Sequence, residues 1–390
     1  MHAPKLQSRR YMTGISLVEM MVAIAIGLVI TAVMSVVYIN SRSAGNRQTQ
    51  LSGMQQSVRM AFEYMAFDAR MVGHLGCFTR HSPTELVLSS PADISNNFRL
   101  GVEGYEYMGT GPNNTFALPS ALPADTTSAS SWTNSPTATT ATVPLASISG
   151  SSTVGLTPGS DILIVRSAGV GRPVRLSGTV AGPATAIPID NRSTGTCPDG
   201  TANVSGFCAN SFGIIASCTN AQTFQVTNIA GASLTLGSPL QVGPVYAANA
   251  SEVFPMQTAI YYVKRSSNDT TTSLYRRVLD GAQDQEQELI ENIESLQVRY
   301  GIDSTAPDPD GIIDGDYVTA DTVTDWSRVI AVRVSLLMRS PNREDGGLVA
   351  TTPLAVNGAT FTRPSSGPVF DRRVFTTTIA LRNRIAYAAP

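Results

Sequence analysis

Hydrophobic positions follow two different patterns over the first 72 residues. Residues 20–39 carry no charged side chain, and as a helix this apolar run would cross the roughly 30 Å core of a bilayer. Further along, apolar residues recur every three or four positions, which predicts one buried helix face. With no proline between Ile15 and Pro83, we expect one helix with a transmembrane part at 15–40 and an amphipathic part at 41–72. The amphipathic stripe consists of Leu51, Met54, Val58, Ala61, Met65, Ala69 and Val72.

After the helix, short runs of alternating or β-branched residues predict strands, most of them bounded by Gly, Pro, Asn or Asp. Residues 288–299 are ambiguous, and their pattern favours a short helix that runs into a strand. The whole pattern predicts an α+β fold, in which an antiparallel β-sheet packs on the carboxyl half of the long helix. The expected strands are residues 161–166, 223–228, 233–236, 259–264, 273–278, 329–338 and 375–382.

The residues that follow the helix are enough for one large or two modest domains. We expect them to form a β-rich globular domain over residues 73–390 with two loop insertions. Residues 111–158 are rich in Ser, Thr, Ala, Pro and Asn, which favours a mobile excursion. Residues 182–217 carry two cysteines, which favours a surface insertion stapled by a disulfide.

Charge and motifs argue against two broad functions. The formal net charge is −2, and no basic run with interleaved aromatics occurs, so we expect no nucleic-acid partner. The chain has three histidines and lacks the serine-hydrolase, phosphate-loop and zinc-protease motifs. A carboxylate pair for glycoside hydrolysis would come from distant segments and is left open by the sequence. We predict a protein that is not an enzyme and needs no cofactor.

One carboxylate, Glu19, stands at the start of the apolar run. Lys5, Arg9 and Arg10 precede it, and Gly14 offers a small residue at a possible cleavage site. A secretory signal peptide is cut after its apolar region, whereas a cut after Gly14 would keep that region in the mature chain. A carboxylate in a membrane helix costs about 2.5–3.5 kcal/mol at mid-bilayer and less near the edge. Glu19 therefore either lies at the membrane surface or pairs with a dedicated cation.

These features together resemble a class III signal sequence, the type IV pilin-like leader that prepilin peptidase cuts after Gly14. The resemblance implies that residues 1–14 are a removed leader and that Ile15 becomes the N-methylated amino terminus. It also implies that Glu19 pairs with the free terminus of a neighbouring subunit and so sets the register of assembly. The sequence departs slightly from the family, with Ile15 where Phe is commonest and Ser16 where Thr is common.

Segments of the body resemble the PilW family of type IV pilus minor pilins. The resemblance implies a structural subunit that helps initiate or prime pilus assembly, supports twitching motility and forms the tip with other minor pilins. Expected partners are other minor pilins, the major pilin, prepilin peptidase, the inner-membrane assembly platform and membrane lipid. The expected location is the inner membrane, with one span and a periplasmic globular domain, and then the pilus at the cell surface. The resembling segments are residues 158–165, 218, 224–227, 293–301, 317–321, 326–333, 373–378 and 381–384.

Two other functions fit the same leader and helix. A type II secretion pseudopilin would share both and differ in its partners. A membrane-tethered periplasmic binding protein would keep its leader uncut and would form no fibre.

The four cysteines are an even number in a chain whose body we expect outside the cytoplasm, where disulfides persist. Three pairings are possible. Our hypothesis is that Cys197 pairs with Cys208 in a local loop, and that Cys77 pairs with Cys218 to tie the end of the helix to the sheet.

Two segments could hold a metal ion. His74, Cys77 and His81 have a spacing that suits zinc, but no fourth ligand is evident. Residues 303–316 bring carboxylates and glycines together as a calcium loop does, although the pattern does not fit an EF-hand. Asp-Gly is equally a signal of a hairpin turn. If calcium binds, its expected ligands are Asp308, Asp310, Asp314 and Asp316.

Overall fold

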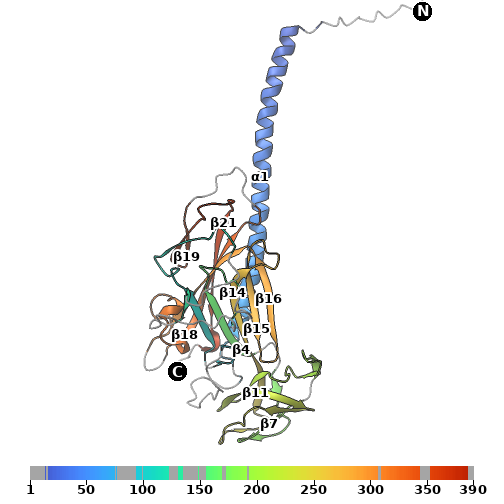
Figure 1. Cartoon of the computed structure of the whole chain (residues 1–390), viewed down its shortest axis with the longest axis vertical. Coiled ribbons are helices and arrows are strands. Elements are labelled where there is room, and N and C mark those ends of the chain that lie inside the picture. Colours follow the sequence, from blue (N-terminus) through green and yellow to red (C-terminus); the bar gives the residue numbers. More distant parts are fainter. Residues whose placement is uncertain are drawn as a thin grey trace, which may run out of the picture. The chain divides into compact units, whose positions relative to one another are not determined.

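The chain forms two compact units, Met1–Gln55 and Gln56–Pro390. The helix α1 (Leu17–Arg70) contributes its first part to one unit and its last part to the other, and the described strands belong to the second unit (Figure 1). The computed structural model describes residues 14, 16–74, 76, 94–98, 100–122, 131–134, 148, 155–168, 173–190, 193–305, 309–342 and 352–384.

In the first unit, α1 is an unbroken helix, as the absence of proline predicts. The hydroxyls of Thr31, Ser35 and Thr49 each donate to the carbonyl four residues earlier, at 2.8, 2.8 and 3.0 Å. A hydroxyl bonded in this way within its own helix needs no partner from outside. Thr31 and Ser35, in the predicted transmembrane part, therefore satisfy their hydroxyl donors within the helix.

In the second unit, the last turns of α1 bury one face. Val58, Ala61, Met65 and Ala69 are at most 2% exposed, and Val72, just after the helix, is fully buried. These positions belong to the predicted apolar stripe, which is confirmed for this part of the helix. Glu63, at a position outside the stripe, is exposed.

A charged residue interrupts the buried face and holds the helix to the sheet. Asp68 is 1% exposed and accepts hydrogen bonds from Arg276 Nε at 2.8 Å and Nη2 at 2.9 Å, and from the Tyr261 hydroxyl at 2.6 Å. The end of the helix is also fixed, because Asn383 Nδ2 donates to the carbonyl of Arg70 at 2.9 Å. Residues far apart in the sequence thus converge on the last two turns of α1.

The main sheet is built around its longest strand, β14 (Ser251–Arg265). The first half of β14 pairs with β10, and its second half pairs with β4 and β15, always antiparallel. Figure 1 labels β4, β14 and β15 in this sheet. One strand therefore connects two groups of strands. Apart from β14 they are β1 (Val102–Tyr107), β3 (Trp132–Thr133), β4 (Ile162–Ala168), β5 (Val174–Arg175), β7 (Ala186–Pro188), β10 (Phe212–Ser217), β11 (Ala221–Ala230), β12 (Ser233–Leu236), β15 (Thr272–Leu279) and β16 (Asp284–Glu291).

Smaller sheets complete the domain. The order β17-β18-β21 forms an antiparallel sheet, β19-β20-β2 forms a second sheet with one parallel pair, and β13-β6 and β8-β9 form two-stranded antiparallel sheets. Their bounds are β2 (Thr115–Ala117), β6 (Val180–Ala181), β8 (Ser193–Thr196), β9 (Ala202–Val204), β13 (Val245–Tyr246), β17 (Ile293–Ile302), β18 (Val329–Arg339), β19 (Leu354–Val356), β20 (Ala359–Thr362) and β21 (Arg372–Ala380), with short 3-10 helices at Ala320–Thr322, Trp326–Arg328 and Arg382–Arg384.

The structure confirms the α+β class and places a strand at each predicted run. The short helix expected within 288–299 is wrong, because β16 is followed directly by β17 there. Asn292 between them has φ of 67°, a left-handed conformation that Asn tolerates better than most residues. This single residue lets one strand end and the next begin where the pattern suggested a helix.

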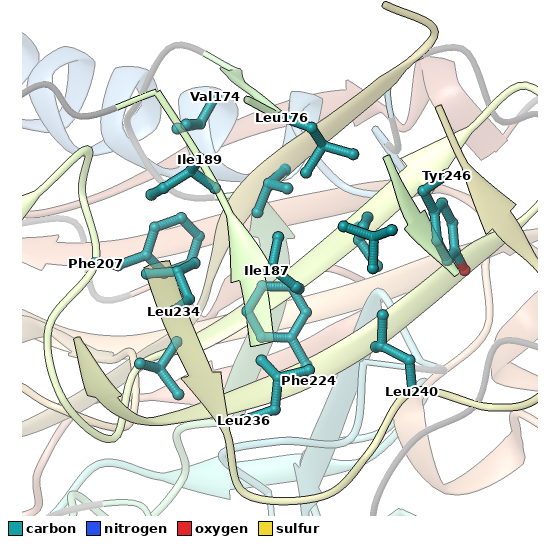
Figure 2. Close-up of a cluster of buried hydrophobic side chains, with 14 of the residues drawn as sticks. Val174, Leu176, Ile187, Ile189, Phe207, Phe224, Leu234, Leu236, Leu240 and Tyr246 are labelled. Atoms are coloured by element: carbon teal, nitrogen blue, oxygen red, sulfur yellow. The ribbon is translucent and has the colours of Figure 1, made fainter. Parts of the chain in front are cut away.

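Both expected insertions contribute to the packed domain. The described parts of 111–158 include β2 and β3, and Trp132 and Ile148 are buried. Residues 182–217 are more than a surface staple, because β10 pairs with β14 in the main sheet. They also supply part of a cluster of buried apolar side chains between β5, β7, β10, β11 and β12, which includes Ile187, Phe207, Phe224 and Leu234 (Figure 2).

We expect Asp68→Ala to destabilise the globular unit. Arg276 would remain largely buried without its carboxylate, and breaking a buried ion pair costs about 3–5 kcal/mol. Thermal unfolding of the full chain, followed by circular dichroism, measures the effect. Glu63→Ala removes an exposed carboxylate from the same helix and should leave the melting temperature nearly unchanged. Equal melting temperatures for the two variants would show that the Asp68 contact contributes little.

Candidate functional site

The residues expected at a cleavage site lie at the start of α1. Gly14 and Ser16 are exposed and precede the helix, and Ile15 lies outside the described residues. The helix begins with the bond from the Met20 N–H to the Ser16 carbonyl, at 3.1 Å. Glu19 is exposed in the first turn, where the helix dipole and the unpaired backbone N–H groups favour a negative charge.

The segment after Glu19 presents apolar side chains on every side. Large side chains from Leu17 to Ile39 are each more than half exposed, from 52% at Val22 to 75% at Leu17. Among the described residues, α1 is the one helix long and apolar enough to cross a membrane. A helix that is apolar all round must be covered by lipid or by other helices. The N-terminal helix therefore has the properties of a membrane anchor.

The local disulfide is confirmed. Cys197 and Cys208 form a bond with their Cα atoms 5.8 Å apart, and it closes the loop that contains β9. Cys77 lies outside the described residues, so its pairing with Cys218 stays a prediction. The zinc hypothesis also depends on Cys77 and on His81, which is likewise outside the described residues.

The acidic segment is a set of turns held by its own carboxylates. Asp314 Oδ2 accepts from the backbone N–H of Ser304 at 2.7 Å, and Asp310 Oδ1 accepts from that of Ile312 at 2.9 Å. Hydrogen bonds from Ser304 lower the pKa of Asp314. Asp316 is exposed, and Asp308 lies outside the described residues.

In this segment, the carboxylates of Asp310 and Asp314 accept hydrogen bonds from nearby backbone N–H groups and do not point to one shared metal position. No group of His, Cys, Asp or Glu placed to hold a metal ion occurs among the described residues. The calcium site therefore stays a prediction.

Sequence patterns did not predict a pair of buried carboxyl groups in the sheet. Asp161 is 2% exposed and accepts from the backbone N–H groups of Tyr107 at 3.0 Å and Val298 at 2.8 Å. It thereby bridges the main sheet and the strand β17. Burial raises the pKa of Asp161 to about 7, and those two N–H groups partly oppose the rise. An aspartate directly before the apolar run 162–165 was the available signal.

Glu106, on β1, is the second member of the pair. It is 3% exposed, and Oε1 accepts from the Thr110 hydroxyl at 3.2 Å, while Oε2 has no partner in the described part of the chain. Burial raises the pKa of Glu106 well above its usual value. The charges of Asp161 and Asp321 add to that rise, and Thr110 and Arg299 oppose it. The pair therefore keeps at least one proton under conditions where ordinary carboxyl groups have lost theirs.

We expect the globular unit to become less stable as the pH rises from about 4 to about 7. The folded chain holds a proton that the unfolded chain releases near pH 4, so unfolding becomes easier across this window. The effect is up to about 1.4 kcal/mol per pH unit for each such proton. Glu106→Gln should flatten this slope because an amide does not titrate, and Asp310→Asn, at an exposed carboxyl, should not. Urea unfolding at a series of pH values tests this, and a slope unchanged in Glu106→Gln would contradict it.

Comparison with known proteins finds one match near each end of the chain. Residues 260–383, about a third of the chain, match the family described as type IV pilus-assembly protein W, PilW. Residues 9–35 match the prokaryotic N-terminal methylation motif, which includes Gly14 and Glu19. Among solved structures, the chain is similar to a type IV-like pilin from Thermus thermophilus, with 13% identity over 46% of this chain and 87% of that one. The TM-score of 0.20 is too low for this likeness to bear on the fold. No curated protein matches.

Proposed function

We propose that this chain is a type IV pilin-like protein, a minor pilin that helps prime pilus assembly and forms the tip. The proposal is supported by the match of residues 260–383 to the PilW family and of residues 9–35 to the N-terminal methylation motif. In this role it is a structural subunit without catalytic activity. It is anchored in the inner membrane by a single helix, with its globular unit in the periplasm, before it enters the pilus at the cell surface. Its partners are the other minor pilins, the major pilin, prepilin peptidase and the assembly platform.

The observation that supports this proposal most directly is the exposed apolar part of α1. Lipid can cover this surface before assembly, and helices of neighbouring subunits can cover it in a fibre. Helices approach closely in apolar surroundings where they carry small residues, and Ala23, Ala25, Gly27 and Ala32 are distributed along this segment. Gly27 has open space around the position of a Cβ atom, so the backbone is accessible there to a neighbouring helix.

Glu19 would give such an assembly its register. Moving a carboxylate into a bundle of apolar helices is costly unless a cation meets it, and the α-ammonium group released by cleavage after Gly14 is a cation of suitable position. Because only one stagger of two parallel helices brings these groups together, pairing selects that stagger.

A pseudopilin of type II secretion is the alternative that shares this helix. The PilW match favours the pilus, since that family is described by pilus assembly. Co-purification with pilus proteins or with secretion proteins separates the two. Loss of twitching motility with intact secretion after deletion would also support the pilus.

The proposal is tested first by the mass and the amino-terminal sequence of the protein extracted from membranes. With active prepilin peptidase we expect a chain that begins at N-methylated Ile15, and without the peptidase a chain that begins at Met1. A chain that begins at Met1 in both cases would be an ordinary membrane-tethered protein, and the pilin role would be wrong.

We expect Glu19→Ala to be cleaved after Gly14 but to assemble poorly. The substitution leaves the cleavage residue in place and removes the partner of the new amino terminus. An unpaired buried charge costs about 3–5 kcal/mol, which is enough to reduce incorporation strongly. Surface pili are counted by electron microscopy and processing is checked by mass. Glu63→Ala, at an exposed carboxylate of the same helix, is the matched control, and normal piliation in Glu19→Ala would exclude the pairing.

A further inference from the structure

The globular unit contains a pocket of about 350 Å³ that the pilin role does not explain. Its lining comes from the segment after β2, the start of β15, β17, the end of β18 and the segment before β21. Leu118, Leu122 and Phe370 give it apolar walls, and Glu294 and Arg339 are its two charged residues. The volume lies at the lower end of the range of about 300–1,000 Å³ found for small-molecule sites.

Arg339 has few partners for a half-buried guanidinium group. Its Nη2 donates to the carbonyl of Thr270 at 3.3 Å, and its Cζ lies 4.4 Å from the centroid of the Phe370 ring. Its Nε is buried and has no acceptor in the described part of the chain. A guanidinium group has five N–H donors, so most of those of Arg339 have no acceptor among the residues that the structure describes.

The carboxylate in the pocket lining is already engaged by another arginine. Both oxygens of Glu294 accept from Arg372, Oε2 from Nε at 2.6 Å and Oε1 from Nη2 at 2.9 Å, in a well-buried pair. Burial lowers the pKa of Arg339, and the positive charge of Arg372 adds to that effect while Glu294 opposes it. The pocket thus combines one neutral ion pair with one cation that lacks a counter-charge.

We propose that this pocket binds a single carboxylate group carried on a short apolar chain. A carboxylate matches the planar guanidinium of Arg339 and would accept from its unpaired N–H groups. A doubly charged anion such as phosphate would meet repulsion from Glu294, whose charge lies in the same lining. The apolar walls suit the hydrocarbon part of the ligand. The ligand is either a free small carboxylic acid or the carboxyl terminus of a polypeptide, because both present this chemistry.

Binding is tested with the full chain in detergent, by saturation-transfer NMR with butyrate and with butyramide as its neutral isostere. We expect transfer to butyrate and little to butyramide. Arg339→Gln should weaken butyrate binding by at least about tenfold, because a charge-assisted hydrogen bond is lost. Ala121→Trp should block the pocket while leaving Arg339 in place, and it is an exposed position that tolerates a large side chain.

Arg373→Gln is the matched control, since it makes the same charge change at a side chain that is 53% exposed and does not line the pocket. It should bind butyrate as the parent chain does. If Arg339→Gln does not fold, Ala121→Trp still decides the question. Equal transfer to butyrate and butyramide, or undiminished butyrate binding in Ala121→Trp, would overturn the proposal. Tighter binding of acetyl-Ala-Ala with a free carboxyl end than of butyrate would identify a polypeptide terminus as the source, and weaker binding would identify a small acid.

Discussion

The exposed apolar surface of the first half of α1 is the constraint on which the rest of this protein depends. Exposing an apolar helix of this length to water is unfavourable, so lipid or another protein must cover the segment. Lipid and neighbouring helices are both apolar, and exchange between them changes little hydrophobic free energy. The two environments differ in how closely small residues let the helix be packed, and in whether the Glu19 carboxylate has a cation to pair with.

In the proposed function, the helix leaves a membrane and enters a fibre, and it must stay attached to its globular unit throughout. Apolar packing of Val58, Ala61 and Met65 provides part of this attachment. Asp68 also fixes the orientation of the helix, because its hydrogen bonds to Tyr261 on β14 and Arg276 on β15 set how the helix is rotated about its axis. Apolar contacts alone would tolerate small rotations, whereas a buried carboxylate with three hydrogen bonds does not.

Several other charged groups in the globular unit are buried at some cost to stability. Asp161 links the main sheet to β17, Glu106 is buried on β1, and Arg339 lies in a pocket whose one carboxylate is paired with Arg372. Apolar residues of similar size would often make a domain as stable or more so. Such groups therefore mark places where folding stability is not the only requirement, and the apolar-walled pocket of Arg339 has space for a ligand.

Elements with a local sequence pattern were predictable before the fold was known. The helical periodicity of a segment without proline predicted α1. A change in the apolar pattern along that segment separated the exposed half of the helix from the half with a buried stripe. Alternation of apolar and polar residues predicted strands such as β4, β15 and β18. Local patterns failed at 288–299, because the left-handed backbone of Asn292 splits a run that otherwise fits a helix. Long-range packing, by contrast, makes β14 join two groups of strands, brings Asp68 to Arg276, and places Arg339 and Glu294 in one pocket lining. These contacts join residues that are far apart in the chain, and neither periodicity nor composition carries information on which distant segments become neighbours.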